Sequence, residues 1–297
     1  VIDGKNMPGR YTIEWRGEHL IYTPLELTGP GKPGWFETEK LVIQKIATHL
    51  TATYDEEKLY CLDTLYVGLL KDNNYSLKYV LALLNSHLMD FHYRAAFETV
   101  HIGSDYLEYR TRYLDTLPIK PASPEIQEEL SRLVDEMLSI SKELPRFGTL
   151  VNDFPSIVSS LQLPLISLAS SPAVVAVELP PVLGTPKLSL EGRRVYLTGK
   201  AFVDMEDGKC ARYLYLYFDG IKTQLHSKSK GEILQLACLP ISASGVDKAL
   251  ARKAELEAKI RELELHRTKV DNEIDRKVYE LYGLTDEEIA MVKSQNT

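Results

Sequence analysis

The chain has 297 residues, of which 44% are hydrophobic and 26% are charged, and its formal net charge is −7 at pH 7. These proportions are those of an ordinary globular protein with enough material for one large or two modest domains. The sequence has no apolar run near the roughly 20 residues that span a bilayer, so we expect no membrane partner, and the acidic total argues mildly against nucleic acid.

Charge and cysteine are distributed unevenly along the chain. Residues 187–230 contain nine Lys and Arg but only five acids, so this segment has a positive net charge although the whole chain is negative. Cys61, Cys210 and Cys238 are far apart and in no metal-ligand spacing, which suits a reducing cytosol better than a disulfide framework. The sequence starts at Val1 with no basic-then-apolar leader, so we expect a cytoplasmic protein and treat the chain as a candidate fragment of a longer one.

Residues 1–120 alternate strand-like runs with turns and contain one clear helix. The runs "YTIEWRGEHLIYTP", "KLVIQKIATHL" and "KLYCLDTLYVGLL" are rich in the β-branched and aromatic types that fit a pleated sheet. The stretch "SLKYVLALLNSHLMDFHYR" predicts the helix, because Ser76 is a favourable N-cap and apolar residues follow at helical spacing from Leu77 to Phe91. We expect this helix to pack against the sheet.

A second helix and a change of composition follow. In "SPEIQEELSRLVDEMLSISKEL", Ser123 is the predicted cap and Pro124 takes the first helical position, and we expect the helix to end near Pro145. Residues 146–246 are richer in Ser, Pro, Leu and Val. Here "RRVYLTGKAFV", "ARYLYLYFDG" and "GEILQLACLPI" are predicted strands and "EDGK" a hairpin turn, so this segment is expected to be a separate β-rich unit.

The chain ends in a long helix, a stop and a short helix. Residues 247–282 repeat apolar positions at spacings of four and three, and such a helix, roughly 50 Å long at about 1.5 Å per residue, needs a partner helix. Gly283 predicts the stop, and Thr285 with Glu288 predicts a capping box for the next helix. The helix before Pro145 is the natural partner, so we expect an antiparallel helical hairpin that carries the β-rich unit as an insertion.

Three stretches, taken in order, resemble a known family. They are "LLNSHLMDFHYR", "YLEYRTRYLDTLPIKPASPEIQEELSRLVDEML" and "LEAKIRELELHRTKVDNEIDRKVYELYGLTDEEI". Together they resemble the C-terminal specificity (target recognition) region of TaqI-like N6-adenine DNA methyltransferases and of type IIG restriction-modification enzymes, and more distantly the specificity subunits of type I systems. In those families a target recognition domain carries an "LNS" helix and an "LPI" segment that leads into a spacer helix. Residues 146–246 have no counterpart in the resemblance.

Fold and function are expected as follows. The chain should be an α+β protein with a mixed α/β target recognition domain (1–120), a first spacer helix (121–145), a β-rich inserted domain (146–246), and a second long spacer helix followed by a short helix (247–297). The resemblance implies sequence-specific recognition of double-stranded DNA that sets the target of an adenine methyltransferase domain or subunit, in cis or in trans. The acidic total charge and the long amphipathic helix leave an alternative, a protein-protein assembly module without DNA contact.

Catalytic motifs of such enzymes are missing from the sequence. It has neither a Gly-rich loop for S-adenosylmethionine nor an Asn-Pro-Pro-Tyr-like loop, so this cofactor, and Mg²⁺ for a nuclease, are expected only on separate catalytic domains. Residues 56–58 (EEK) and 207–209 (DGK) lack a suitable upstream Asp and are interpreted as solvated turns. His49, His87 and His92 are in no metal spacing. We therefore interpret the chain as a reader of DNA without a cofactor of its own.

Side chains with paired donors are the candidates for reading base edges, and cations are the candidates for holding phosphates. Arg110 and Arg112 alternate on "YLEYRTRYL", so in a strand both would point to one face; the equally weighted alternative is a surface ion pair with Glu108 or Asp115. In the insertion, basic residues lie between tyrosines, although "YLYLYF" is more simply a strand with one core face. The predicted DNA-binding residues are Gln44, Lys45, Thr48, Arg94, His101, Ser104, Tyr106, Arg110, Arg112, Arg193, Arg194, Lys200, Arg212 and Lys222.

Overall fold

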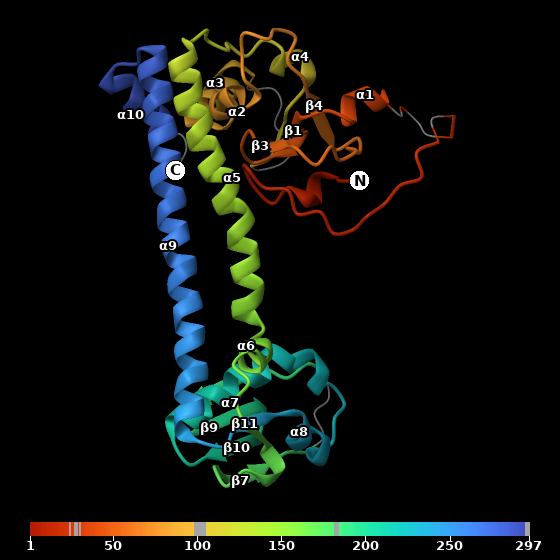
Figure 1. Ribbon diagram of the computed structural model, residues 1–297, viewed down its shortest axis with the longest axis vertical. Coiled ribbons are helices and arrows are strands. Elements are labelled where there is room, and N and C mark those ends of the chain that lie inside the picture. Colours follow the sequence, from red (N-terminus) through yellow and green to blue (C-terminus); the bar gives the residue numbers. More distant parts are fainter. Residues whose placement is uncertain (24, 27–28, 30, 98–104, 181–183, 295–297) are drawn as a thin grey trace. The chain divides into compact units, whose positions relative to one another are not determined.

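The computed structural model describes residues 1–23, 25, 26, 29, 31–97, 105–180 and 184–294 (Figure 1). The chain divides into two compact units: unit 1 is Val1–Glu143 with Leu265–Thr297, and unit 2 is Leu144–Glu264. Helices and small antiparallel sheets occur in both units, which confirms the α+β class. Across the described ranges, each helix is too short or too polar to cross a membrane.

Unit 1 is built on two small sheets. Strands β1 (Lys40–Gln44), β3 (Ala52–Asp55) and β4 (Leu65–Gly68) form a sheet of order β3-β1-β4, and β2 (Ile46–Ala47) pairs with β5 (Leu107–Glu108). Its short helices are η1 (Gly4–Asn6), α1 (Pro33–Phe36), α2 (Leu77–Asn85), α3 (His87–Ala96), α4 (Thr111–Leu114) and α10 (Asp286–Ser294). Two long helices, α5 (Pro124–Asn152) and α9 (Ala243–Tyr282), run through both units.

The single helix predicted from Ser76 onward is two helices. Ser76 caps α2 as expected, because its hydroxyl accepts from the Tyr79 amide at 3.0 Å. Ser86 then leaves helical geometry (φ −67°, ψ 151°) and caps α3 by accepting from the Met89 amide at 3.2 Å. Its hydroxyl also donates to the Leu83 carbonyl at 2.7 Å. A serine that competes for backbone groups thus breaks a run that apolar periodicity alone predicts to be continuous.

The core of unit 1 lies between the sheet and α2. Leu41 and Val42 on β1 are buried, and so are Leu81 and Leu83 on the helix, which fits the expectation that the helix packs on the sheet. Lys40 at the start of β1 is also fully buried; its ammonium pairs with the carboxylate of Asp55 on β3 and donates to the Phe36 carbonyl at 2.8 Å. A buried charge requires such partners, because an unpaired one is strongly destabilising.

Within unit 1 the long helices pair in antiparallel fashion, as expected. Lys277 on α9 reaches Glu129 on α5 at 2.5 Å, and His266, which lies earlier on α9, reaches Glu136, which lies later on α5, at 2.7 Å. The end of α9 is also as predicted: Gly283 has φ 74°, and Thr285 and Glu288 bond reciprocally at 2.8 and 3.3 Å.

The predicted end of the first long helix near Pro145 is wrong, because α5 continues to Asn152. A proline inside a helix removes one backbone hydrogen bond and costs about 3 kcal/mol. Packing beyond the proline compensates for this cost in unit 2, where Phe147 and Val151 contact the hydrophobic core and Lys253 of α9 donates to the Val151 carbonyl at 2.9 Å.

Unit 2 packs helices on a four-stranded antiparallel sheet. The sheet has the order β7-β10-β9-β8, and β6 pairs separately with β11. The strands are β6 (Leu165–Ser167), β7 (Val174–Glu178), β8 (Ser189–Glu191), β9 (Arg194–Thr198), β10 (Ala201–Met205) and β11 (Cys238–Pro240). The helices are α6 (Phe154–Ser160), η3 (Leu168–Ser170), α7 (Gly208–Ile221), η4 (Lys222–Leu225) and α8 (Lys230–Leu236).

Unit 2 contains one of the predicted strand runs as a hairpin, but helices where other strands were predicted. The run "RRVYLTGKAFV" is the β9–β10 hairpin, with Gly199 at φ 57° in its turn. The strand prediction for "ARYLYLYFDG" is wrong, because these residues lie in α7 and bury Ala211, Leu214 and Phe218, which are spaced by three and four. The predicted "EDGK" turn is instead the start of that helix, where Asp207 caps the Cys210 amide at 2.7 Å. Most of "GEILQLACLPI" is α8, and only its end is β11.

One close approach in unit 2 can be tested by mutation. A Cβ added to Gly220 of α7 would lie 2.5 Å from Cδ of Pro155 in α6, whereas a Cβ on Gly231 of α8 would meet nothing within 4 Å. We predict that Gly220→Ala lowers the free energy of unfolding by about 1–3 kcal/mol through overpacking, and that the matched Gly231→Ala leaves it unchanged or raises it by up to about 1 kcal/mol. Urea denaturation followed by circular dichroism measures both; equal stability of the two variants would contradict the packing.

Candidate nucleic-acid interface

Cations and tyrosines gather on one part of unit 1, over the β2–β5 pair, β4 and α4. The Tyr109 amide donates to the Lys45 carbonyl at 2.7 Å, which joins the end of β1 to the segment after β5. The Lys45 ammonium lies 5.1 Å from the ring centroid of Tyr66 on β4. We define the basic-aromatic surface as the residues of this region that carry a cation or an accessible phenol ring: Lys45, Tyr66, Tyr106, Arg110, Arg112 and Tyr113.

The two alternating arginines do not lie on a strand, so that expectation is wrong. Arg110 precedes α4 and Arg112 lies within it, because β5 ends at Glu108. Arg110 forms the surface ion pair that was the alternative interpretation: its guanidinium reaches Glu108 at 2.5 Å, which raises the arginine pKa. Arg112 packs over its neighbour, with its guanidinium carbon 4.5 Å from the ring centroid of Tyr113 and a nitrogen 2.6 Å from the hydroxyl. Both arginines are exposed.

The side chains of two other predicted readers, Gln44 and Arg94, are engaged inside unit 1, and a third, Thr48, contributes its backbone carbonyl. The Gln44 carboxamide donates to the carbonyls of Gly4 and Met7 at 2.8 and 3.0 Å. Arg94 donates to the Thr48 carbonyl and to an Asp90 carboxylate oxygen, the latter at 2.9 Å. These side chains therefore hold the fold together in this structure. His101 and Ser104 lie outside the described residues, whereas Tyr106 is 51% exposed.

Asp90 on α3 joins several parts of unit 1 through its hydrogen bonds, and the sequence analysis did not predict this role. Its buried carboxylate accepts from the Leu50 amide at 2.6 Å and from the Tyr109 hydroxyl at 3.1 Å, and it also contacts His49 at 3.1 Å. Burial raises the pKa of Asp90, but the hydrogen bonds from His49, Arg94 and the Leu50 amide outweigh burial and hold this pKa well below its usual range. The four-residue spacing of Asp90 and Arg94 on one helix was the available signal.

The candidates in unit 2 are not brought together. Arg194 forms a two-pronged ion pair with Asp204 across the β9–β10 hairpin, at 2.7 and 2.6 Å, and Lys222 pairs with Asp219 at 3.0 Å. Arg193 and Lys200 are exposed at opposite ends of that hairpin, and Arg212 is exposed on α7. Tyr213, expected beside these cations, is buried in α7 and donates to the Cys238 carbonyl at 3.1 Å.

The two acidic triplets take part in ordinary surface contacts. In residues 56–58, Glu56 pairs with Lys142 at 2.6 Å, and in residues 207–209, Lys209 pairs with Asp247 at 2.8 Å. Ligand atoms of Glu206, Asp207 and Cys210 lie within 4.8 Å of one another. Burial, followed by the charge of Asp207, raises the pKa of the Cys210 thiol to about 12.

The "LNSH" motif ties three parts of unit 1 together. Asn85 exchanges two hydrogen bonds with the backbone of Ala52 on β3, both at 3.0 Å. Two residues later, the His87 amide donates to Asp275 of α9 at 2.9 Å, and the His87 ring nitrogen Nδ1 contacts the other oxygen of that carboxylate. We call the contact between His87 and Asp275 the clasp. It links the "LNS" motif to "DRKVYELYGLT", which lies in the third of the stretches that resemble the family; His87 and Asp275 are 188 residues apart.

Charges around the clasp give it a proton dependence. The hydrogen bond to Asp275 raises the pKa of His87, against the opposing effects of burial and of Arg10. Burial, and then the charge of Asp275, raises the pKa of Asp271, one turn earlier on α9. The clasp is therefore strongest when the imidazole is protonated.

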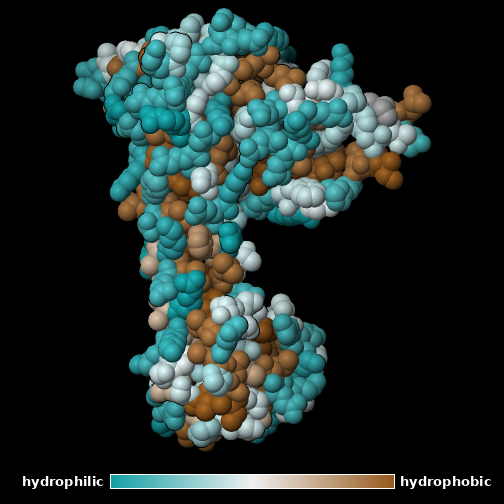
Figure 2. Space-filling view, in the orientation of Figure 1, coloured by the Kyte–Doolittle hydropathy of each residue, from teal (hydrophilic) through white to brown (hydrophobic). Residues whose placement is uncertain are grey.

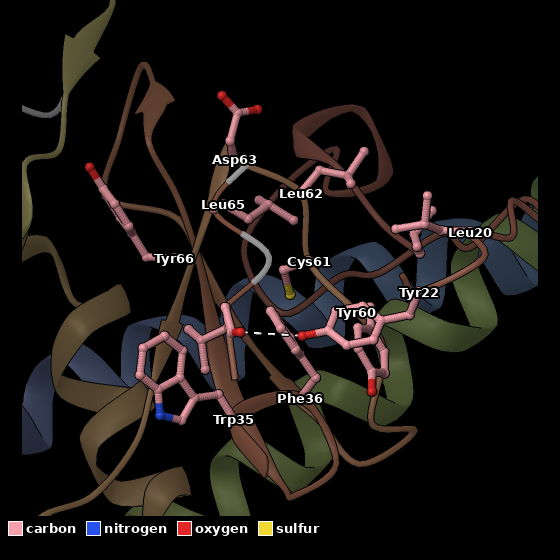
Figure 3. A pocket seen from close by; sticks show the side chains of 14 residues that line it. Leu20, Tyr22, Trp35, Phe36, Tyr60, Cys61, Leu62, Asp63, Leu65 and Tyr66 are labelled. Atoms are coloured by element: carbon pink, nitrogen blue, oxygen red, sulfur yellow. Dashed lines mark hydrogen bonds between the residues drawn. The ribbon is translucent and has the colours of Figure 1, made fainter. Parts of the chain in front are cut away.

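An aromatic cleft lies in the N-terminal part of unit 1, beside β4 (Figure 3). Its volume is about 640 Å³. The ring centroids of Phe36 and Tyr60 are 4.7 Å apart and nearly parallel, and Tyr22 lies 5.1 Å from Tyr60. Trp35 and Tyr66 also line the cleft. These residues come from separate loops and strands, which explains why the linear sequence did not reveal the cleft.

Comparison with known proteins finds a family match in the first part of unit 1. Residues 1–119 match the family model of the TaqI-like C-terminal specificity domain, which confirms the family resemblance over that range. A chain in a solved structure of a type I R-M system is similar at 12% identity and a TM-score of 0.35, covering 81% of this chain and 80% of that one. None of the curated proteins compared matches the chain.

Removing the clasp should have a pH-dependent effect. The folded-state pKa of His87 is raised, so its stabilising contribution is fully present below the unfolded-state value of about 6.5 and is lost as pH rises through the folded value. We predict that Asp275→Asn lowers the amide protection of α3 by about 1–2 kcal/mol at pH 6 and by less at pH 9. Hydrogen exchange corrected for intrinsic rates measures this. The control is His92→Gln, which should not change the pH profile; a pH-independent loss in Asp275→Asn would contradict the proposed role.

Proposed function

We propose that this chain is the target recognition part of a restriction-modification enzyme, and that unit 1 binds double-stranded DNA and thereby sets the site of adenine methylation. The observation that carries the proposal is the match of residues 1–119 to the TaqI-like specificity domain, which coincides with the residues that carry the basic-aromatic surface. Exposed cations beside aromatic rings are suited to phosphates and base edges.

The two arginines have different parts in the proposed mechanism. Arg112 is held over the Tyr113 ring and hydroxyl, so its planar guanidinium is oriented before DNA arrives, which reduces the entropy lost on binding. Arg110 must exchange its Glu108 partner for DNA. Solvent screens an exposed pair of this kind, so it contributes little and the exchange is energetically accessible. Arg112 is therefore our first candidate for base readout and Arg110 for a phosphate contact.

Catalysis belongs to a partner in this proposal. An adenine methyltransferase domain or subunit, in cis or in trans, supplies S-adenosylmethionine and flips the adenine, and a nuclease domain would supply Mg²⁺. The long helices α5 and α9 are proposed to be the spacer that joins unit 1 to that partner. The support is their antiparallel pairing in unit 1 and the position of α5 shortly after the "LPI" segment.

A second candidate function is assembly without DNA contact, and exposed hydrophobic residues favour it. Ile21 is 87% exposed and Leu25 fully exposed in the N-terminal segment, where Figure 2 shows hydrophobic atoms at the surface of unit 1. Apolar groups exposed in this way are typical of protein contacts. Light scattering with and without a purified methyltransferase partner tests assembly, and duplex binding separates the two functions.

Arg112→Ala tests the proposed function directly. If Arg112 reads a base, the variant should lose about 1–3 kcal/mol of binding free energy on the preferred duplex and relax preference at one position. If it holds a phosphate, all duplexes should weaken alike and the salt slope should fall by about one. Gel-shift titrations with the preferred and a scrambled duplex at several salt concentrations measure both quantities.

Arg252→Ala is the matched control, because Arg252 is an exposed arginine of unit 2 paired with Glu255 at 3.1 Å. It should leave both affinities unchanged. Failure of the wild-type chain to bind either duplex at low salt would contradict the proposed function, and equal losses in the two variants would contradict the assignment of the basic-aromatic surface.

A further inference from the structure

We propose that the aromatic cleft of unit 1 binds an unstacked nucleobase of the DNA that the basic-aromatic surface holds. This inference rests on the proposed function and extends it, because it adds a nucleotide outside the duplex to the ligand. The arguments are the geometry of the rings, the fit of the surrounding backbone, and two lysines placed on rings of the cleft.

Trp35 is 44% exposed and Tyr22 and Tyr60 are half-buried, so these rings can offer a face for stacking, whereas Phe36 is buried and packs on Tyr60. The ring centroids of Phe36 and Tyr60 are 4.7 Å apart, with an angle of 24° between the ring planes. The ring of Tyr22 also contacts that of Tyr60, with 5.1 Å between the centroids. Figure 3 shows Tyr22, Phe36 and Tyr60 grouped together with Trp35 beside them. Stacking on such rings stabilises any base, because every base has a π face. The volume of about 640 Å³ leaves room for a planar ring with its sugar.

The loop before α1 is fitted closely to these rings. Gly31 has φ +67°, and a Cβ on it would lie 2.9 Å from Cε2 of Phe36. The Tyr22 hydroxyl donates to the Gly31 carbonyl at 3.2 Å, which is the dashed line in Figure 3. Only glycine permits both this backbone conformation and this approach. The loop is therefore packed directly on the Phe36 ring and tied to Tyr22, which favours a pre-formed cleft.

Two lysines give the cleft the charge that a nucleotide requires. The Lys32 ammonium lies 5.4 Å from the ring centroid of Trp35, and the Lys45 ammonium lies 5.1 Å from that of Tyr66. Both rings line the cleft, and Lys45 and Tyr66 also belong to the basic-aromatic surface. Aromatic rings bordered by cations are the combination with which proteins hold unpaired nucleic acid.

These contacts also indicate where the sugar-phosphate backbone would run. Asp63 lines the cleft and repels phosphate, so the backbone should pass by Lys45 and Lys32. Since Tyr66 is shared, the cleft is continuous with the basic-aromatic surface. The path then leads from duplex held at that surface to a base in the cleft.

The test compares a fully paired duplex with the same duplex carrying one unpaired central nucleotide. The full chain is used with Trp15→Phe, which leaves Trp35 as the single tryptophan. We expect the unpaired nucleotide to tighten binding about tenfold and to quench Trp35 fluorescence. Tighter binding together with quenching supports the proposal. Binding of the paired duplex without gain or quenching overturns it and leaves the proposed function intact, whereas no binding of either DNA contradicts both.

Variants of Trp35, the exposed ring of the cleft, test whether its ring causes the gain in affinity. In gel shifts, Trp35→Ala should abolish the tenfold gain while paired-duplex affinity stays unchanged, and Trp35→Phe should retain most of the gain because it keeps a ring. Leu25→Ala, an exposed apolar residue of the same segment outside the cleft lining, should behave as wild type. A Trp35→Ala variant that retains the full gain overturns the proposal.

Discussion

The contact of His87 with Asp275 is the interaction on which the arrangement of unit 1 depends. The Asp275 carboxylate of α9 accepts a hydrogen bond from the His87 amide at the start of α3 and contacts the His87 imidazole. Two residues earlier, Asn85 forms two hydrogen bonds with β3. The three consecutive residues "NSH" therefore connect strand β3, the helices α2 and α3, and the long helix α9. A mostly buried carboxylate tolerates this position only with its partners, and this gives a physical reason for two motifs so far apart in sequence to occur together.

The cations of unit 1 fall into two sets: some pair with buried carboxylates, and others are accessible to solvent. Asp90 and Asp55 engage Arg94 and Lys40 in the interior, so these cations serve the fold. The cations of the basic-aromatic surface, in contrast, lie against aromatic rings or pair with the half-buried Glu108, and solvent reaches them. The same division applies to unit 2, where Arg194 is bound to Asp204. An acidic chain can thus present a local cationic surface, which reconciles the net charge of −7 with the proposed DNA contact.

Local signals predicted the elements well where one residue type determines the conformation. Gly283, the Thr285–Glu288 box and the Ser76 cap were all readable from sequence. Predictions were wrong where packing decides: "ARYLYLYFDG" alternates as a strand does, but its buried residues also fit a helical face and the core of unit 2 selects the helix. The aromatic cleft and the clasp depend on residues that are distant in sequence, so neither could be predicted from one sequence.

The central claim is that unit 1 contacts duplex DNA through the basic-aromatic surface. Photo-cross-linking of the full chain to duplexes with bromodeoxyuridine at successive positions, followed by mass spectrometry of the cross-linked peptides, tests it most directly. The account predicts adducts on the peptides that contain Lys45, Tyr66 and Tyr106–Tyr113. Adducts confined to unit 2 or to α9, with none on those peptides, would contradict it.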